Sequence, residues 1–287
     1  MKRIIVIFHL YYEDQLDYFI DRLSNIHGVN WDLLVTGNSI SEDSQRALRT
    51  LKPDVRFLET ENVGYDVWPF IEAVKNIDLD AYDIVIKLHT KNSTGDEIFK
   101  VNGLPMKDYE WREELVGSIL RSKEQFSEVM SLFDSHTDAG MVCSARLLTV
   151  MHAPEDCDPL EREYDRLNLK VVDRRFCAGT MFAVRADLLK VVADSDVSAD
   201  MFPSKCSSHS GGTLAHVYER IFSMLVSSQG YGIYTVDKSF LLYFMLFYKR
   251  YIQPVGFWLF GLDREGERRV KTLTLFGMKF RLDDGEV

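Results

Sequence analysis

RIIVIF, at residues 3–8, is a run of five apolar residues behind one arginine. A continuous apolar run of this length is typical of a β-strand buried on both faces, as in a parallel sheet covered by helices. Over residues 14–26, apolar side chains recur at spacings of three and four, which predicts a helix. The chain therefore opens with a buried strand followed by a helix.

The same alternation continues to residue 93. Further elements are predicted at 31–35 (strand), 41–51 (helix), 55–58 (strand), 70–77 (helix) and 82–88 (strand). Ser41 is expected to cap its helix. This rhythm predicts an α/β fold with a mostly parallel central sheet, right-handed crossovers and helices on both faces. In such sheets ligands bind beyond the carboxyl ends of the strands, so residues at those ends are the candidates for function.

The second half of the chain is predicted to complete the same domain, up to residue 238. Its expected elements are 108–133 (one long helix), 139–143 (strand), 146–174 (a long binding loop), 176–184 (strand and turn), 186–192 (helix), 195–212 (a mobile lid), 213–227 (helix) and 231–236 (strand). Residues 239–287 form a C-terminal appendage with apolar and basic character.

Composition excludes several classes of protein. The chain has 287 residues, with 44 acidic against 34 basic side chains, and its net charge of −10 argues against a nucleic-acid partner. The four cysteines show no CxxC spacing and the N-terminus lacks a cleavable signal, so a cytoplasmic location is expected. The most apolar stretch, 239–248, has ten uncharged residues and is too short to span a bilayer.

The appendage differs in charge from the rest of the chain. Residues 249–281 carry eight Lys or Arg against three Asp or Glu, a net of +5, with aromatic residues between them. This pattern suits an anionic membrane surface, so a peripheral contact through 239–281 at the inner face of the membrane is one interpretation. The other is a packed element with solvated charges.

Two clusters of candidate residues follow the first and third predicted strands. His9 and Tyr11 follow the first, with burial as aromatic strand-end residues as the alternative. Asn62, Gly64 and Asp66 follow the third, where a tight turn would aim Asp66 at the crevice. The alternative for Asp66 is an ordinary helix N-cap.

A third cluster, Lys87, His89 and Lys91, ends the fourth predicted strand. Alternate residues of a strand share a face, so these three side chains are expected to point together. Cationic groups at a strand end suit an anionic ligand such as a pyrophosphate. A solvated surface run is the alternative.

The fourth cluster lies at the start of the predicted helix 213–227. Thr213 follows two glycines, and backbone N–H groups at a helix N-terminus favour negative charge. His216, Glu219 and Arg220 are neighbours on one helix face, which suits general-base chemistry. A Glu–Arg–His network that merely fixes the helix is the alternative. No GxGxxG after the first strand, Walker A loop, HExxH or GxSxG motif is present, which argues against dinucleotide oxidoreductases and covalent hydrolases.

At these four clusters the sequence resembles the rhamnan synthesis protein F family of bacterial polysaccharide glycosyltransferases. The matching stretches are HLYY (9–12), ENVGYDVWPF (61–70), YDIVIKLHTKNS (82–93), WREELVGSIL (111–120), AGTMFAVR (178–185) and GTLAHVYERIF (212–222). They occur in family order and cover most of the chain.

The resemblance implies transfer of a sugar, rhamnose from dTDP-rhamnose, onto a cell-surface polysaccharide or lipid-linked glycan. It implies a GT-A-like fold, with a nucleotide-sugar-binding half at 1–93 and an acceptor-binding half at 94–238. It also implies that the donor is bound by residues of the four clusters and by Gly179 and Thr180 of AGTMFAVR. The Asp-x-Asp metal motif of GT-A enzymes is missing, since residues 87–91 read KLHTK. No cofactor is therefore expected, a divalent metal is left open, and lysine ammonium groups are expected to neutralise the diphosphate.

Inversion at the sugar would require a base for the attacking hydroxyl. Glu219 is the first candidate, His216 would orient or replace it, and Asp66 is the third. Two other classes of protein remain open. One is a non-catalytic nucleotide- or glycan-binding module with a degenerate transferase fold, and the other is a lipid-surface adaptor that uses the basic C-terminal segment.

Overall fold

The computed structural model describes residues 2–91, 98–101, 104–150, 157–170, 172–202, 213–236, 244–245, 247–265 and 270–282. The chain divides into two compact units. Unit 1 comprises Met1–Val101 with Pro105–Asp237, and unit 2 comprises Asn102–Leu104 with Lys238–Val287.

A seven-stranded sheet organises unit 1, in the order β11-β7-β10-β4-β1-β2-β3. Its strands are β1 (Arg3–His9), β2 (Asn30–Gly37), β3 (Arg56–Glu59), β4 (Ile84–His89), β7 (Ala139–Cys143), β10 (Phe182–Arg185) and β11 (Gly232–Thr235). Among these strands β10 alone runs antiparallel to its neighbours, β4 and β7. Two small two-stranded sheets accompany it. In one, β5 (Ile98–Val101) pairs with β6 (Leu104–Lys107), and in the other β8 (Leu148–Val150) pairs with β9 (Arg175–Cys177).

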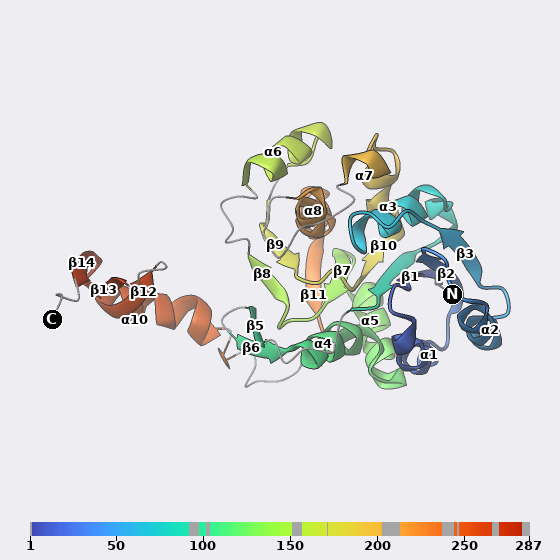
Figure 1. Ribbon diagram of the computed structural model, residues 1–287, viewed down its shortest axis with the longest axis horizontal. Coiled ribbons are helices and arrows are strands. Elements are labelled where there is room, and N and C mark those ends of the chain that lie inside the picture. Colours follow the sequence, from blue (N-terminus) through green and yellow to red (C-terminus); the bar gives the residue numbers. More distant parts are fainter. Residues whose placement is uncertain are drawn as a thin grey trace. The chain divides into compact units, whose positions relative to one another are not determined.

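Helices cover both faces of this sheet (Figure 1), which confirms the expected α/β architecture with a mostly parallel sheet. One face carries α1 (Leu16–Leu23), α2 (Glu42–Leu51), α4 (Asp108–Leu120) and α5 (Lys123–Ser135). The other carries α3 (Val67–Lys75), α6 (Cys157–Arg166), α7 (Lys190–Ala193) and α8 (Leu214–Ser228). Short 3₁₀ turns occur at η1 (Glu13–Gln15), η2 (Leu79–Ala81), η4 (Ala186–Leu189) and η5 (Ala199–Met201).

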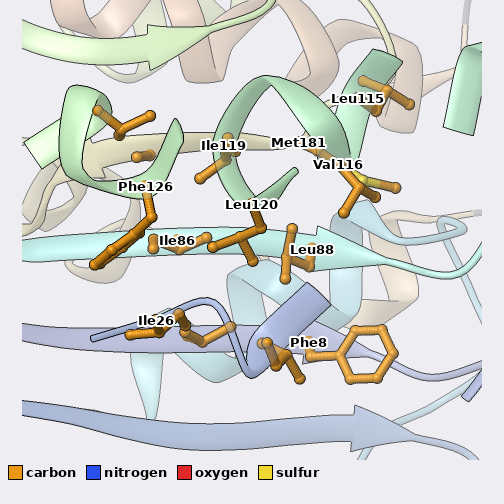
Figure 2. Packing of buried hydrophobic residues seen from close by; sticks show 14 of the residues in the cluster. Phe8, Ile26, Ile86, Leu88, Leu115, Val116, Ile119, Leu120, Phe126 and Met181 are labelled. Atoms are coloured by element: carbon orange, nitrogen blue, oxygen red, sulfur yellow. The ribbon is translucent and has the colours of Figure 1, made fainter. Parts of the chain in front are cut away.

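The two faces of β4 belong to two different hydrophobic cores. Ile84, Ile86 and Leu88 point into the core under α4 and α5, where Figure 2 shows Ile86 and Leu88 packed among aliphatic and aromatic side chains. Val85 and the residues that alternate with it face α3 and α8. Burial on both faces explains why the central strands are nearly continuous apolar runs.

Several local predictions can now be checked. Ser41 caps α2, with its hydroxyl accepting a hydrogen bond from the N–H of Ser44, as expected. The single helix predicted over 108–133 is wrong, because α4 ends at Leu120 and Ser122 caps a separate helix, α5. The binding loop predicted over 146–174 contains β8 and α6. Most of the lid predicted over 195–212 lies outside the described residues.

Unit 2 consists of a helical segment followed by three strands. Its elements are the π-helix η6 (Tyr248–Ile252), α10 (Gln253–Leu259), β12 (Phe260–Glu265), β13 (Val270–Leu275) and β14 (Met278–Leu282), the strands forming an antiparallel sheet in that order. In the described part of the whole chain, no helix has both the length and the hydropathy needed to cross a membrane.

Candidate functional site

Three strand ends bring polar side chains into one row at the carboxyl edge of the sheet. The strand register pairs His9 of β1 with His89 of β4 on one side and with Thr36 of β2 on the other. All three side chains point to the α3/α8 face, since they alternate with residues of the other core. The row is buried, and His9 Nδ1 lies 3.1 Å from the Thr36 hydroxyl.

The centre of the site is an ion pair between Lys87 and Asp66. The Lys87 ammonium donates to Asp66 Oδ2 and to the Thr180 hydroxyl, the latter at 2.8 Å, and Thr180 in turn donates to Asp66 Oδ2 at 2.6 Å. Lys87 is 1% exposed, and its ammonium lies over the rings of Phe70 and Phe222. One buried cation therefore joins the start of α3 to the turn before β10.

Two left-handed turns hold the partners of Lys87 in place. Gly64 and Tyr65, just before Asp66, have φ values of 63° and 55°, and Gly179 and Thr180 have φ values of 85° and 50°. Both glycines are also close-packed, because a Cβ on Gly64 would lie 2.6 Å from the Phe202 ring. Non-glycine residues with positive φ cost free energy, so these turns persist because their surroundings fix them.

The first turns of α8 form a second polar group beside this pair. Glu219 accepts a hydrogen bond from the N–H of Gly179 at 2.8 Å and lies 3.4 Å from Arg220 Nη1. Arg220 also donates to the carbonyl of His216 at 2.6 Å, and its guanidinium lies over the Phe176 ring. The His216 imidazole contacts the Thr213 hydroxyl at 2.7 Å and the ring of the exposed Tyr65.

Burial and charge set the protonation of the site. Burial lowers the pKa of His9 to about 4 and the pKa of His89 to about 3, so both imidazoles are neutral near pH 7. Burial alone would raise the pKa of Asp66, but the attraction of His89 and Lys87 and the hydrogen bonds from Lys87 and Thr180 outweigh it and hold that pKa far below its usual range. Burial lowers the pKa of Lys87, and Asp66 opposes the shift. At neutral pH the positive charge that pairs with the Asp66 carboxylate therefore comes from Lys87.

These contacts correct the interpretation of the third cluster. The Lys87 ammonium is buried and already bound by Asp66 and Thr180, rather than placed at the surface of a crevice as a free cation. His89 is buried and neutral rather than cationic. Lys91 does not share the face of Lys87, since β4 ends at His89 and the Lys91 ammonium lies 4.7 Å from the Trp111 ring of α4, on the opposite side of the sheet.

The remaining residues expected to bind the donor are exposed, buried or outside the described part of the chain. Tyr11 and Asn62 are exposed in the loops that leave β1 and β3. Arg220 is 8% exposed, and its guanidinium donates to the carbonyl of His216 one turn earlier in the same helix. The two glycines before Thr213 lie outside the described residues.

Sequence reasoning missed two members of the site. Thr36 contacts His9, and aligning the ends of the first two predicted strands would have found it, since both strands are parallel neighbours. Tyr65 was quoted within ENVGYD but given no role, yet its exposed ring lies against His216. No local signal marks Tyr65, because its neighbour is 151 positions away in the chain.

Among the described residues at this edge, the donor atoms do not fit a divalent metal ion. In the described part of the chain, no group of three or more His, Cys, Asp or Glu side chains is arranged to hold one. At the strand end, the Asp66 carboxylate is bound by the Lys87 ammonium, a cation that would repel a second one. We therefore derive no step through a metal.

Comparison with known proteins gives one family and a few distant relatives. Residues 1–231 match the family model described as rhamnan synthesis protein F. Among curated proteins, the chain is 26% and 25% identical over 243 residues to the uncharacterised protein WxcX of two strains of Xanthomonas campestris pv. campestris. These matches cover 82% of this chain and 33% of WxcX, so the chain spans about a third of the length of these relatives.

Similarity to solved structures is weaker. The chain is 11% identical to residues 1–349 of Staphylococcus aureus TarS, with a TM-score of 0.44 over 83% of this chain and 58% of that one. It is 13% identical to the mannosyltransferase PcManGT of Pyrobaculum calidifontis, solved with GDP-Man and Mn²⁺, with a TM-score of 0.41 over 83% of this chain and 55% of that one.

Proposed function

Because the chain belongs to the rhamnan synthesis protein F family, we propose that it is a glycosyltransferase for polysaccharide synthesis, which moves a sugar from a nucleotide-sugar donor onto a glycan or lipid-linked glycan. The observation that carries the proposal is the meeting of Asp66, Thr180 and Glu219, from three distant segments, at the carboxyl edge of the sheet. Ligands of open α/β sheets bind at this edge.

For the donor we propose dTDP-rhamnose, transferred with inversion in one displacement. Inversion needs a base that takes the proton of the attacking hydroxyl. Asp66 is a poor base, because Lys87 and Thr180 hold its pKa far below the ordinary value. We assign it instead to holding the site together, and we favour Glu219.

Glu219 fits the role of base by its position. Its side chain is 22% exposed, while the N–H of Gly179 fixes one carboxylate oxygen and Arg220 approaches the other. A carboxylate held in this way is oriented before the acceptor arrives, which is what efficient proton transfer requires. His216, which is partly exposed one turn earlier, is the second candidate.

We further propose that transfer is independent of divalent metal. The reason is that the Asp66 carboxylate, which could otherwise bind a metal ion, is already paired with the ammonium group of Lys87.

We also propose a cytoplasmic location, since nucleotide sugars are the substrates.

The test is release of dTDP from dTDP-rhamnose by the full chain, with and without a rhamnan acceptor and with excess EDTA. We expect release that the acceptor stimulates and that EDTA leaves unchanged. Loss of release in EDTA, restored by magnesium or manganese, would contradict metal independence. Binding of the nucleotide in a thermal-shift assay without any turnover would instead support the alternative, a non-catalytic binding module.

A further inference from the structure

Unit 2 exposes an unusual share of apolar side chains. Among the described residues, sixteen large apolar side chains are exposed, and eleven of them belong to unit 2, which contributes far fewer described residues than unit 1. Single exposed apolar residues are normal on a protein surface, but a concentration of them marks an interaction site.

The helical segment carries most of these side chains at helical spacing. Phe247, Ile252, Val255 and Leu259 are 53%, 44%, 56% and 42% exposed. They lie in the continuous helical run formed by η6 and α10 and the residue before it, at intervals of five, three and four residues. The interval of five falls within the π-helix, whose turns are wider, so the four residues share one side of the segment.

The turn between β13 and β14 adds exposed apolar side chains next to the end of this segment. The N–H groups of Phe276 and Gly277 donate to the carbonyls of Leu259 and Trp258, at 3.1 and 2.8 Å. The hairpin turn is therefore attached to the end of α10. Phe276 and Met278 are 66% and 60% exposed, and Trp258 is 56% exposed. We call these seven residues the C-terminal apolar face: Phe247, Ile252, Val255, Trp258, Leu259, Phe276 and Met278.

We infer that the C-terminal apolar face docks onto an anionic lipid surface. Residues 249–281 carry a net charge of +5 in a chain whose total is −10, so positive charge is concentrated in the part of the sequence that carries the exposed apolar groups. Anionic leaflets attract basic segments of this kind, and apolar side chains enter the boundary between headgroups and acyl chains. Tryptophan, here Trp258, is enriched at that boundary.

Charge also argues against a second copy of the chain as the occupant. Two apposed copies of this face would bring two segments of net charge +5 together, and like charges across an interface disfavour association. A lipid surface with anionic headgroups satisfies the apolar and the basic groups at once. The inference does not depend on sugar transfer, because neither nucleotide nor glycan enters the argument or its test.

The experiment is co-sedimentation of the full chain with vesicles of phosphatidylcholine alone and with about 30% phosphatidylserine. We expect binding to the anionic vesicles, weak binding to the neutral ones, and a decrease of at least about tenfold in the partition coefficient when salt is raised to about 0.5 M. Absence of binding to anionic vesicles would overturn the inference.

Two sets of variants test the face itself on separate elements. Phe247→Ser/Ile252→Ser/Val255→Ser in the helical segment should lower the partition coefficient by about 100-fold, and Phe276→Ser/Met278→Ser in the hairpin by about tenfold or more. The matched control, Tyr109→Ser/Val172→Ser/Met201→Ser, changes three exposed side chains of unit 1 and should bind like the wild type. Wild-type binding by both test variants would contradict the inference. Conversion of a dimer to a monomer with vesicle binding unchanged would show a self-association surface instead.

Discussion

Both faces of β4 are buried, but they differ in polarity toward the end of the strand. Ile84, Ile86 and Leu88 on the α4/α5 face are all aliphatic and buried in one core. Figure 2 shows Ile86 and Leu88 in this core. On the α3/α8 face, Val85 is followed by Lys87 and His89, which are equally buried. One strand thus combines an ordinary hydrophobic face with a face that buries a charge and an imidazole.

The difference between the two faces shows where the strand has a buried charge that stability alone does not require. Burying an ammonium group costs free energy unless a carboxylate and further hydrogen bonds compensate it. Lys87 is compensated by Asp66 and Thr180, which come from distant segments. A hydrophobic residue at this position would pack without such partners, which is why we propose a functional role for the polar end of this face.

The largest effect is expected from Lys87→Met, which leaves the Asp66 carboxylate without its cation. We expect the free energy of unfolding to fall by about 3–5 kcal/mol, measured by urea denaturation. Ile86→Val, on the other face of the same strand, should cost about 1 kcal/mol. Adding Asp66→Asn to Lys87→Met should recover part of the loss, because the uncompensated charge is removed. Strictly additive losses would show that the pair is not coupled.

Glu219→Gln tests the polar face for catalysis rather than stability. If Glu219 is the base, kcat should fall by about 100-fold or more, with donor affinity and unfolding free energy near those of the wild type. Glu163→Gln is the matched control, since Glu163 also pairs with an arginine, Arg166, but on α6. A large loss of stability with kcat retained in the folded protein would show that Glu219 and Arg220 form a structural network instead.

Gly64→Ala probes the turn that presents Asp66. The new Cβ would meet the Phe202 ring at 2.6 Å, in addition to the cost of a φ of 63°. We expect a loss of about 2–3 kcal/mol in unfolding free energy. Gly28→Ala has a similar φ of 67° but open space around the Cβ, so it should cost about 1 kcal/mol. Equal losses would mean that close packing at Gly64 contributes nothing.

The pH dependence of stability tests the two buried imidazoles of the polar face. His9 and His89 have folded pKa values of about 4 and about 3, below the ordinary value of 6.5, so the unfolded chain binds more protons in acid. Stability should therefore fall as the pH drops below about 6.5, by about 1.4 kcal/mol per pH unit for each imidazole. Asp66 adds a loss below its ordinary pKa, as the pH falls toward the lower folded one.

Urea denaturation between about pH 6.5 and about pH 4.5 measures this slope. His9→Gln and His89→Gln should each reduce it by about half. An unchanged slope in both variants would mean that neither imidazole is held neutral by burial.

The fold follows from the sequence because its signals are local. The apolar run at 3–8, the spacing within α1 and the capping by Ser41 each depend on residues a few positions apart. These signals predicted a mostly parallel sheet with helices on both faces, and the structure confirms it. The break between α4 and α5 was missed, because the apolar spacing continues across Ser122.

The site follows from the sequence less completely because its contacts are long-range. Asp66 and Thr180 are 114 positions apart, and Thr180 precedes an antiparallel strand rather than following a parallel one. A search for polar residues that follow predicted strands therefore could not bring Asp66 and Thr180 together. Lys91 was placed with Lys87 because alternation was extended beyond the end of β4, where it no longer holds.

The position of β10 has a consequence for exchanging parts between relatives. Strands β3, β2, β1 and β4 come from the first 93 residues and β10, β7 and β11 from later ones, so the hydrogen bonds between β4 and β10 are the seam of the sheet. The Lys87–Thr180 bond crosses the same seam. A chimera joined between β4 and the later strands takes Asp66 and Lys87 from one parent and the residue at position 180 from the other, so without a threonine there the Lys87 ammonium loses one of its two acceptors.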